Sequence, residues 1–560
     1  MLATLKHRHV RRVRKTASQR ARAVSALTRD YLQRAAMPPP PRRIADFSPG
    51  QIVVLALLLL LLASIPVFTH PLPPLSDYIN HLARMHVIAH GADNANLSRY
   101  YQIDWQIVPN LMIDIIIPPL ARFMSVFVAG QLFTVLLFGV MISGALALHR
   151  ALFGRWSVVP LIALPLIYNH IFLVGLMNYL FGIGIAMWAL AAWIGLRDRP
   201  MVLRLAVATV LVVAMFFCHL FTVGLYGLGL LAYELWRLWL GRGESLGRRL
   251  VDFFAAGLPF LACLPLMLAS PTLRLAGENY WEPRGKIDGL MYVIQVYSDI
   301  VAFSLVAIFV TALAWAARHR LLRMHPAGWL ILAIGTVVYL AMPRTLFASY
   351  IADQRLPIAI AFMLLAAVDL RMPTRIVRRG FIAVVLTLLA VRVIEVDATW
   401  SQLSTTTREF RNSVKRVTPG AKVLVAYADN TTGDDPSDLG LVHAACIAII
   451  ERAALVSTAF TVPGKQIMHM RPDYRGFVDI EDGSPPSISQ LIVEADKPQE
   501  DTTDYWRRWP SRYDFVYVLF TQDDAPNPDP TRLTLAVDGE RFQLYRIKRP
   551  DAPAGSAAPK

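Results

Sequence analysis

Long apolar stretches alternate with short basic connections over most of the chain before residue 396. The stretch Ile52–Phe68 (IVVLALLLLLLASIPVF) and the stretch Val126–Leu148 contain no charged residue. Each is close to the roughly 17–25 residues that a helix needs to cross a bilayer. The pattern therefore predicts an α-helical polytopic membrane protein.

Arginines mark the connections between the apolar stretches, and their positions predict the topology. The basic connections contain Arg150 and Arg155; Arg197, Arg199 and Arg204; Arg237, Arg242, Arg248 and Arg249; Arg318, Arg320 and Arg323; and Arg371, Arg375, Arg378 and Arg379. Because short basic loops favour the cytoplasmic side, each interval between them should hold an even number of spans. We expect hairpins at 157–196, 200–240, 253–317 and 327–370, and a last span at about 380–395. The total is about 11 transmembrane helices, with the N-terminus in the cytoplasm and the C-terminus outside.

Two of these stretches need a particular interpretation. The hairpin at 200–240 is short for two helices, and we place its turn near Cys218-His219. The preceding hairpin, at 157–196, is expected to turn at Asn169 to Asn178. The stretch 110–124 (NLMIDIIIPPLARFM) contains Asp114 and a proline pair, which removes helix donors. It is expected to form a helix that lies at the interface or dips into the membrane, within a long first external loop at 70–125.

The chain changes character at residue 396, where charged residues return and short alternating runs appear. The runs 421–428, 513–520 and 541–547 are typical of strands, and 441–455 is typical of a helix. We expect a small α/β domain outside the membrane at 396–550. Residues 1–50 are predicted to be a basic, largely disordered cytoplasmic tail, and 551–560 a disordered tail.

Composition excludes several other classes of protein. The 560 residues are 55% hydrophobic and only 17% charged, whereas soluble domains carry about 25% charged residues. The basic residues behind the net charge of +16 lie between apolar runs instead of on one folded face, which argues against a nucleic-acid partner. Three cysteines, Cys218, Cys263 and Cys446, form no spaced framework, so we expect neither a disulfide nor a zinc site.

The first external loop holds the strongest candidate chemistry. In PLPPLSDYINHLARMHVIAH, the residues Asp77, His81 and Arg84 are spaced i, i+4, i+7 and share one face of a helix. Leu75, Ile79, Leu82 and either Met85 or His86 would then face lipid. The competing interpretation is an interfacial amphipathic helix whose polar face is only solvated. No metal signature is present, although Asp77 with His81 could weakly hold a divalent ion.

The order of these elements, together with the strings PPLSDYINHLAR, VPNLMID and YNHIFLVGLMNYLFGIG, resembles the GT-C superfamily of integral-membrane glycosyltransferases. The resemblance covers roughly residues 50 to 395. It implies a sugar donor carried on polyprenyl phosphate or diphosphate, and it implies that Asp77 is the general base or the carboxylate that positions the acceptor. A second acidic residue of the family would be Asp104 or Asp114.

Sugar transfer from a lipid phosphate also needs cations opposite the carboxylate, because negative charge develops on the leaving group. Arg344 and Arg355 bracket a short external loop, PRTLFASYIADQR, and a guanidinium suits phosphate. The alternatives for Arg355 are a pair with Asp353 or contact with lipid headgroups. Candidate substrate-binding residues are therefore Asn80, His81, Arg84, Asp114, His219, Arg344, Asp353 and Arg355. Asp114 is a functional candidate because it lies within an apolar helix, and Arg122 is its candidate partner.

Weaker candidates lie in two other external segments. Asn169, His170 and Asn178 either bind a sugar or cap their helices. The segment GENYWEPRGK, with Glu278, Tyr280, Trp281 and Glu282, suits sugar stacking, but Trp and Tyr are also interfacial anchors.

These features together predict a glycosyltransferase, of either the hexosyl or the pentosyl type, at the periplasmic face of a bacterial inner membrane. Its partners would be a polyprenyl-phosphate sugar, membrane lipids and a glycan, lipid or protein acceptor, with no certain cofactor and a divalent metal as an option. The alternatives are a transporter or flippase of a lipid-linked glycan, and a non-catalytic assembly protein for envelope polysaccharide.

Overall fold

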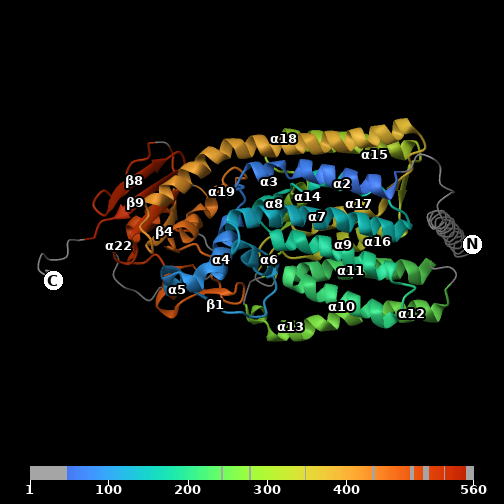
Figure 1. The fold of residues 1–560 in the computed structure, drawn as a ribbon, viewed down its shortest axis with the longest axis horizontal. Helices are drawn as coiled ribbons and strands as arrows, with labels where there is room; N and C mark the ends of the chain where they lie inside the picture. The colour runs from blue at the N-terminus through green and yellow to red at the C-terminus, as the bar shows by residue number, and fades with distance from the viewer. Residues whose placement is uncertain are drawn as a thin grey trace, which may run out of the picture.

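The computed structural model describes residues 47–549 except 241–243, 276–278, 347–348, 430, 432–434, 480–484, 496–503 and 523. The predictions for most of the N-terminal tail and for 551–560 lie outside the described residues. The molecule is elongated, with a helical bundle at one end and a sheet-containing part at the other (Figure 1). Below, the end of the bundle that meets the sheet is called the domain end, and the other the distal end.

Mostly long helices build the bundle. They are α2 (Pro49–Ala63), α3 (Ile65–Thr69), α7 (Val126–Phe153), α9 (Met177–Gly195), α10 (Met201–Cys218), α11 (Leu220–Leu240), α15 (Asp299–Arg318), α16 (Pro326–Ala341), α17 (Leu356–Ala366) and α18 (Arg375–Ser413). Shorter elements are a 3₁₀ helix at Val159–Leu166, α8 (His170–Val174), α12 (Leu246–Ala255), a 3₁₀ helix at Leu258–Ala262, α13 (Cys263–Ala269), a 3₁₀ turn at Pro271–Arg274 and α14 (Pro283–Met291).

Among the described residues, five helical segments are long and apolar enough to cross a membrane, and four more apolar helices are shorter. This supports the membrane protein predicted from the sequence, whereas the number of eleven spans stays a prediction. The break of the 200–240 hairpin is confirmed, since α10 ends at Cys218 and His219 has an extended backbone before α11. The hairpin at 157–196 is less regular than expected, because its first half contains a 3₁₀ helix and α8.

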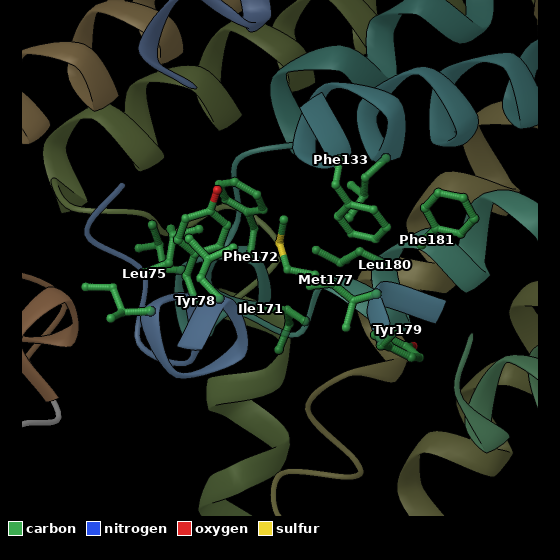
Figure 2. Packing of buried hydrophobic residues seen from close by; sticks show 14 of the residues in the cluster. Leu75, Tyr78, Phe133, Ile171, Phe172, Met177, Tyr179, Leu180 and Phe181 are labelled. Carbon is green, nitrogen blue, oxygen red and sulfur yellow. The ribbon is translucent and has the colours of Figure 1, made fainter. Parts of the chain in front are cut away.

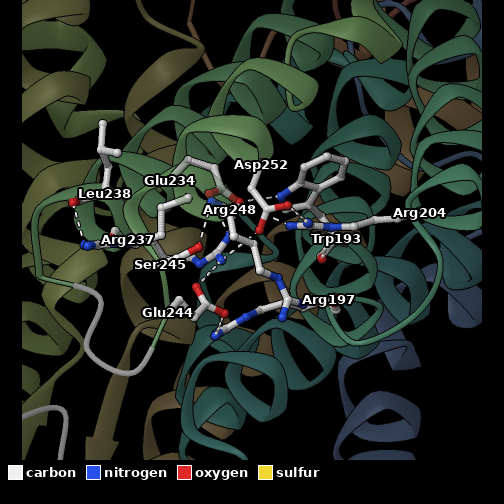
Figure 3. A network of polar contacts seen from close by, with 11 residues as sticks. Trp193, Arg197, Arg204, Glu234, Arg237, Leu238, Glu244, Ser245, Arg248 and Asp252 are labelled. Atoms are coloured by element: carbon white, nitrogen blue, oxygen red, sulfur yellow. Dashed lines mark hydrogen bonds and ion pairs between the residues drawn. The ribbon is translucent and has the colours of Figure 1, made fainter.

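The basic connections meet at the distal end of the bundle. Arg155 forms an ion pair of 2.7 Å with Asp369, and β2 (Leu322–Met324) pairs with β3 (Val368–Leu370). A buried network there joins α9, α10, α11 and α12 (Figure 3). It contains three arginines and three carboxylates: Arg197, Arg204, Arg237, Glu234, Glu244 and Asp252. Several of the arginines that the sequence presented only as topology signals therefore also neutralise buried carboxylates.

The first loop forms α4 (Tyr78–His90), a 3₁₀ turn at Gly91–Asp93, α5 (Ala95–Tyr100), β1 (Tyr101–Ile103) and α6 (Met112–Ala121). The prediction that one face of α4 meets lipid is wrong. Leu75, Ile79, Leu82 and Met85 are at most 1% exposed, because α4 is packed between α6, α7 and the C-terminal part of the chain. Figure 2 shows Leu75 and Tyr78 against Ile171 and Phe172 of α8.

The C-terminal part contains a five-stranded sheet in the order β5-β4-β7-β9-β8. Its elements are a 3₁₀ turn at Val414–Arg416, β4 (Lys422–Tyr427), α19 (Leu439–Val442), a 3₁₀ turn at Ala444–Cys446, α20 (Ile447–Arg452), β5 (Leu455–Val456), β6 (Met468–Met470), a 3₁₀ helix at Pro472–Phe477, α21 (Ile488–Glu494), α22 (Trp509–Arg512), β7 (Phe515–Leu519), β8 (Leu533–Gly539) and β9 (Phe542–Ile547). The three predicted strands are confirmed, as β4, β7 and β9. The single helix expected at 441–455 is wrong, because this segment is divided among short helical turns and β5.

The first loop and the C-terminal part form one packed unit. Strand β1 of the loop pairs antiparallel with β6, and the hydroxyl of Tyr101 donates to the carbonyl of Ala454 at 3.0 Å. One continuous hydrophobic core runs through the bundle, the loop and the sheet. Helix α18 passes from the bundle into the C-terminal part without a break at residue 396, where the sequence changes character.

Candidate active site at the domain end

Asp77 lies where the first loop enters α4. The backbone N–H groups of Ser76 and Asp77 donate to the carbonyls of Leu173 and Val174, at 2.9 and 3.1 Å. Gly175 follows with a φ of +93°, and a Cβ there would lie 2.9 Å from the nitrogen of Asp77. The backbone of α8 thus fixes Asp77, whose side chain is 21% exposed and therefore accessible to a small molecule.

Arg355 approaches the same region from the loop between α16 and α17. Its Nη2 donates to the carbonyl of Tyr350 at 2.7 Å, and its Nη1 lies 2.9 Å from Nε2 of His219. The guanidinium is buried, and its Nε has no hydrogen-bond partner. A guanidinium and an imidazole that are far apart in the sequence therefore meet at the domain end, where Asp77 also lies.

A second cation cluster surrounds Arg344 on the same loop. Nζ of Lys286, on α14, lies 2.8 Å from a carboxylate oxygen of Asp353. The Arg344 guanidinium lies 3.6 Å from the carboxylate of Glu282 and 5.1 Å from the ring centroid of Tyr350. Asp353 is thus paired with a lysine, not with Arg355. No sequence pattern singled out Lys286, because its segment contains other charges at similar spacing.

Tyr350 connects the two clusters, because its ring packs against Arg344 while its carbonyl accepts from Arg355. Gln354 between them is fully buried, and neither its Oε1 nor its Nε2 has a hydrogen-bond partner. Buried polar atoms without partners are costly. The Gln354 amide and both guanidinium groups leave N–H donors without partners, so this loop suits an anion such as a phosphate.

Asp114 forms a pair that the sequence did not predict. Its carboxylate accepts from Nε and Nη2 of Arg84 at 2.7 and 3.0 Å, and both side chains are 1% exposed. The predicted pair with Arg122 is wrong, since Arg122 follows the end of α6 and is exposed. Arg84 and Asp114 therefore hold α4 against α6, and this buried pair is separate from the Asp77–Arg355 region.

Asn80 and His81 contact the C-terminal part. Both polar ends of the Asn80 amide are bonded there: Nδ2 donates to the carbonyl of Thr458 at 2.8 Å, and Oδ1 accepts from the N–H of Phe460 at 2.9 Å. His81 packs against the ring of Phe460 at 5.5 Å between centroids. Burial lowers the pKa of His81 well below its usual value, and the charge of Arg84 lowers it further.

Sequence reasoning missed His443, which lies close to the proposed base. It follows α19 in the C-terminal part, and its Nε2 is 3.7 Å from Oδ1 of Asp77. Its Nδ1 is 3.2 Å from Nδ2 of Asn80. A lone histidine in an apolar segment carries no pattern that would reveal this contact.

The weaker candidates have structural roles. Asn169 caps α8 by accepting from the N–H of Phe172, and His170 stacks on Tyr292 with centroids 3.9 Å apart. Asn178 donates to the carbonyl of Asn110 and so holds the end of the first loop.

In the second weaker segment, the Trp281 indole donates to the carbonyl of Leu340, and Glu282 is the carboxylate beside Arg344. The backbone carbonyl of Tyr280 accepts a hydrogen bond from the N–H of Arg344. Glu278 lies outside the described residues. Asp104 is exposed beside the β1–β6 pair, away from Asp77.

A cavity of about 890 Å³ lies at the other end of α4 from Asp77. Its lining includes Trp105, Pro118, Phe123 and the arginines Arg122 and Arg471. Among the described residues, no cluster of three or more His, Cys, Asp or Glu could hold a metal ion, and an ion between Asp77 and His81 stays a prediction.

Two solved structures are similar to this chain. Apo ArnT from Cupriavidus metallidurans gives a TM-score of 0.49 at 12% identity, covering 89% of this chain and 98% of that one. ArnT from the same organism bound to undecaprenyl phosphate gives a TM-score of 0.45 at 11% identity with the same coverage. The chain matches no known family model and no curated protein. Because both structural likenesses are partial, we infer the function from the residues of the site.

Proposed function

We propose that this chain is a membrane glycosyltransferase of the GT-C type, which transfers a sugar from a polyprenyl-phosphate donor to a glycan, lipid or protein acceptor. The observation that carries the proposal is an accessible carboxylate, Asp77, at the same end of the bundle as a buried guanidinium whose Nε has no partner, Arg355. Sugar transfer with inversion requires this arrangement, because a base must remove a proton while cations stabilise the leaving phosphate.

In the proposed reaction, the acceptor hydroxyl loses its proton to the carboxylate of Asp77 as its oxygen bonds to the anomeric carbon. The bond between that carbon and the phosphate oxygen breaks, and the electron pair stays on the lipid phosphate. Arg355 stabilises this charge, and His219 and the Tyr350 carbonyl hold the Arg355 guanidinium in place. Arg344 on the same loop and Lys286 on α14 are further cations nearby, paired with Glu282 and Asp353.

The proposed location is the periplasmic face of a bacterial inner membrane. The support is the position of the basic connections, which gather at the distal end of the bundle, opposite the site. With those connections in the cytoplasm, Asp77 and the C-terminal part face the periplasm. A lipid-linked donor is consistent with the periplasmic side, because the lipid phosphate activates the sugar and no soluble nucleotide is needed.

The test compares Asp77→Asn with Asp93→Asn, a change at an exposed carboxylate of the same loop. Purified protein is incubated with polyprenyl-phosphate hexoses and pentoses in detergent, and released polyprenyl phosphate is measured by mass spectrometry. We expect release by the parent chain and by Asp93→Asn, and a loss of at least about 100-fold in Asp77→Asn. Full activity of a folded Asp77→Asn protein would contradict the proposal.

The same preparations in proteoliposomes distinguish the alternatives. A flippase would move a fluorescent polyprenyl-phosphate sugar across the bilayer without releasing its phosphate. An assembly protein would show neither release nor movement as a single purified chain.

A further inference from the structure

The segment that carries His443 docks directly on the chain that leads to Asp77. A Cβ at Gly440 would lie 2.6 Å from Cβ of Pro74, three residues before Asp77. This close approach places α19 against the first loop, and His443 at its end faces Asp77 with 3.7 Å between Nε2 and Oδ1. The C-terminal part therefore reaches the proposed base itself.

The hydrogen bonds around Asn80 determine which nitrogen of His443 carries the proton. The N–H of Phe460 must donate to an oxygen, so the Asn80 atom beside it is Oδ1 and the other is the NH₂ group. One hydrogen of that group goes to the carbonyl of Thr458. The other is directed to Nδ1 of His443, which must accept it. The proton of the neutral imidazole then resides on Nε2, the nitrogen that faces Asp77.

Burial agrees with this assignment, because it lowers the pKa of His443 to about 4 and keeps the ring neutral near pH 7. The rings of Phe460 and His443 pack edge to face with centroids 4.9 Å apart. His443 is 6% exposed, so its orientation is fixed by packing as well as by Asn80.

From these contacts we infer that the C-terminal part completes the active site: His443 is a positioning residue whose Nε2–H orients the carboxylate of Asp77 and stabilises its ionised form. The inference rests on the proposed role of Asp77 as base. The separation of 3.7 Å is longer than a hydrogen bond, and it closes when the acceptor draws the carboxylate into place, as catalytic hydrogen bonds do in substrate complexes.

The charged and titratable groups near Asp77 include Arg355 from the α16–α17 loop, His443 from the C-terminal part, and His81, one turn along α4, whose backbone N–H donates to the carbonyl of Asp77. Burial holds both histidines neutral. Loss of the His443 donor removes a favourable partner of the carboxylate, so the carboxylate takes up a proton more readily.

The test uses the full chain and four variants, with release of polyprenyl phosphate as the readout. For His443→Ala we expect kcat to fall about tenfold to hundredfold, with the acidic limb of the pH–rate profile moved about one unit higher. His443→Gln keeps an N–H donor at the same reach and should recover much of both. Gly440→Ala pushes the segment away from Pro74 and should resemble His443→Ala. His469→Gln is the matched control, because His469 on β6 also lies where the C-terminal part meets the first loop. It should match the parent chain.

Thermal unfolding of each variant in detergent shows whether it is folded. A folded His443→Ala protein with the parent kcat and the parent acidic limb would overturn the inference. So would a His443→Gln protein that loses as much as His443→Ala with no change in the limb, because packing alone would then explain the loss. If Asp77→Asn is also fully active, the proposed function itself fails, and this outcome is distinct from the other two.

Discussion

Gly175 offers a way to move Asp77 without altering any polar group. The residue ends α8 with a φ of +93°, and an added Cβ would lie 2.9 Å from the nitrogen and 3.0 Å from the Cβ of Asp77. Carbon atoms in contact prefer about 3.5–4.0 Å, so Gly175→Ala must displace Asp77 or α8 by roughly 0.5–1 Å. The left-handed backbone adds a cost of about 1–2 kcal/mol for an L-residue.

The change should therefore affect both stability and rate. A displacement of about 1 Å at a reacting group can cost on the order of 100-fold in rate. We expect kcat for release of polyprenyl phosphate to fall about tenfold to hundredfold, while the affinity for the lipid phosphate, measured by its inhibition of the reaction, changes little because Arg355 does not move.

Gly154→Ala is the matched control for this experiment. Gly154 ends α7 with a φ of +69°, but nothing lies within 4 Å of an added Cβ. The control therefore has the backbone strain without the collision, and it should lower the unfolding temperature while leaving kcat unchanged. If Gly175→Ala and Gly154→Ala lose the same stability and keep the same kcat, the argument that α8 positions Asp77 is refuted.

Four further outcomes follow from the contacts described. Arg84→Ala should lower the free energy of unfolding by about 3–5 kcal/mol, because it leaves a buried carboxylate unpaired. Arg122→Ala, at an exposed residue, should change this free energy by no more than about 0.5 kcal/mol. Denaturant or thermal unfolding in detergent measures both. Glu234→Gln should lower the unfolding temperature by weakening the distal network, and an unchanged KM for the sugar donor would show that this network is remote from the site. Arg355→Lys should raise the KM for the donor about tenfold, because lysine cannot reproduce the planar fork; an unchanged KM would argue against phosphate binding by this residue. The pKa of His443 is near 6.5 in the unfolded chain and about 4 in the folded protein. Between these values the unfolded chain binds an extra proton, so stability is lost as the pH falls from 6.5 to 4. His443→Gln should therefore show a weaker acid dependence of its unfolding temperature.

Features that depend on local pattern could be predicted from the sequence. The break at His219 was visible because two apolar runs meet there at a polar residue, and the helix at 112–121 was visible despite its proline pair. The strands β4, β7 and β9 were found because their alternating or apolar runs are bounded by turn residues. In each case neighbours along the chain carry the information.

Pairings between distant segments could not be predicted in this way. Spacing along α6 suggested Arg122 for Asp114, but tertiary packing buries Arg84 against it. The same limit concealed Lys286, which meets Asp353 only because α14 folds under the α16–α17 loop. His443 was hidden too, because its position depends on how the C-terminal part closes over the first loop. A buried charge takes whichever partner the fold brings near, and the sequence alone does not order those partners.

Helix α18 links the distal end of the bundle to the sheet in one piece. Its 39 residues correspond to a rod about 58 Å long. At its end, Oγ of Ser413 bonds the hydroxyl of Tyr517 in the central strand β7 at 2.7 Å, so the sheet is attached to the rod. One residue inserted in this helix would raise the sheet by about 1.5 Å and turn it by about 100°. His443 would then no longer meet Asp77, so the length of a single helix sets the height and the rotation at which the site closes.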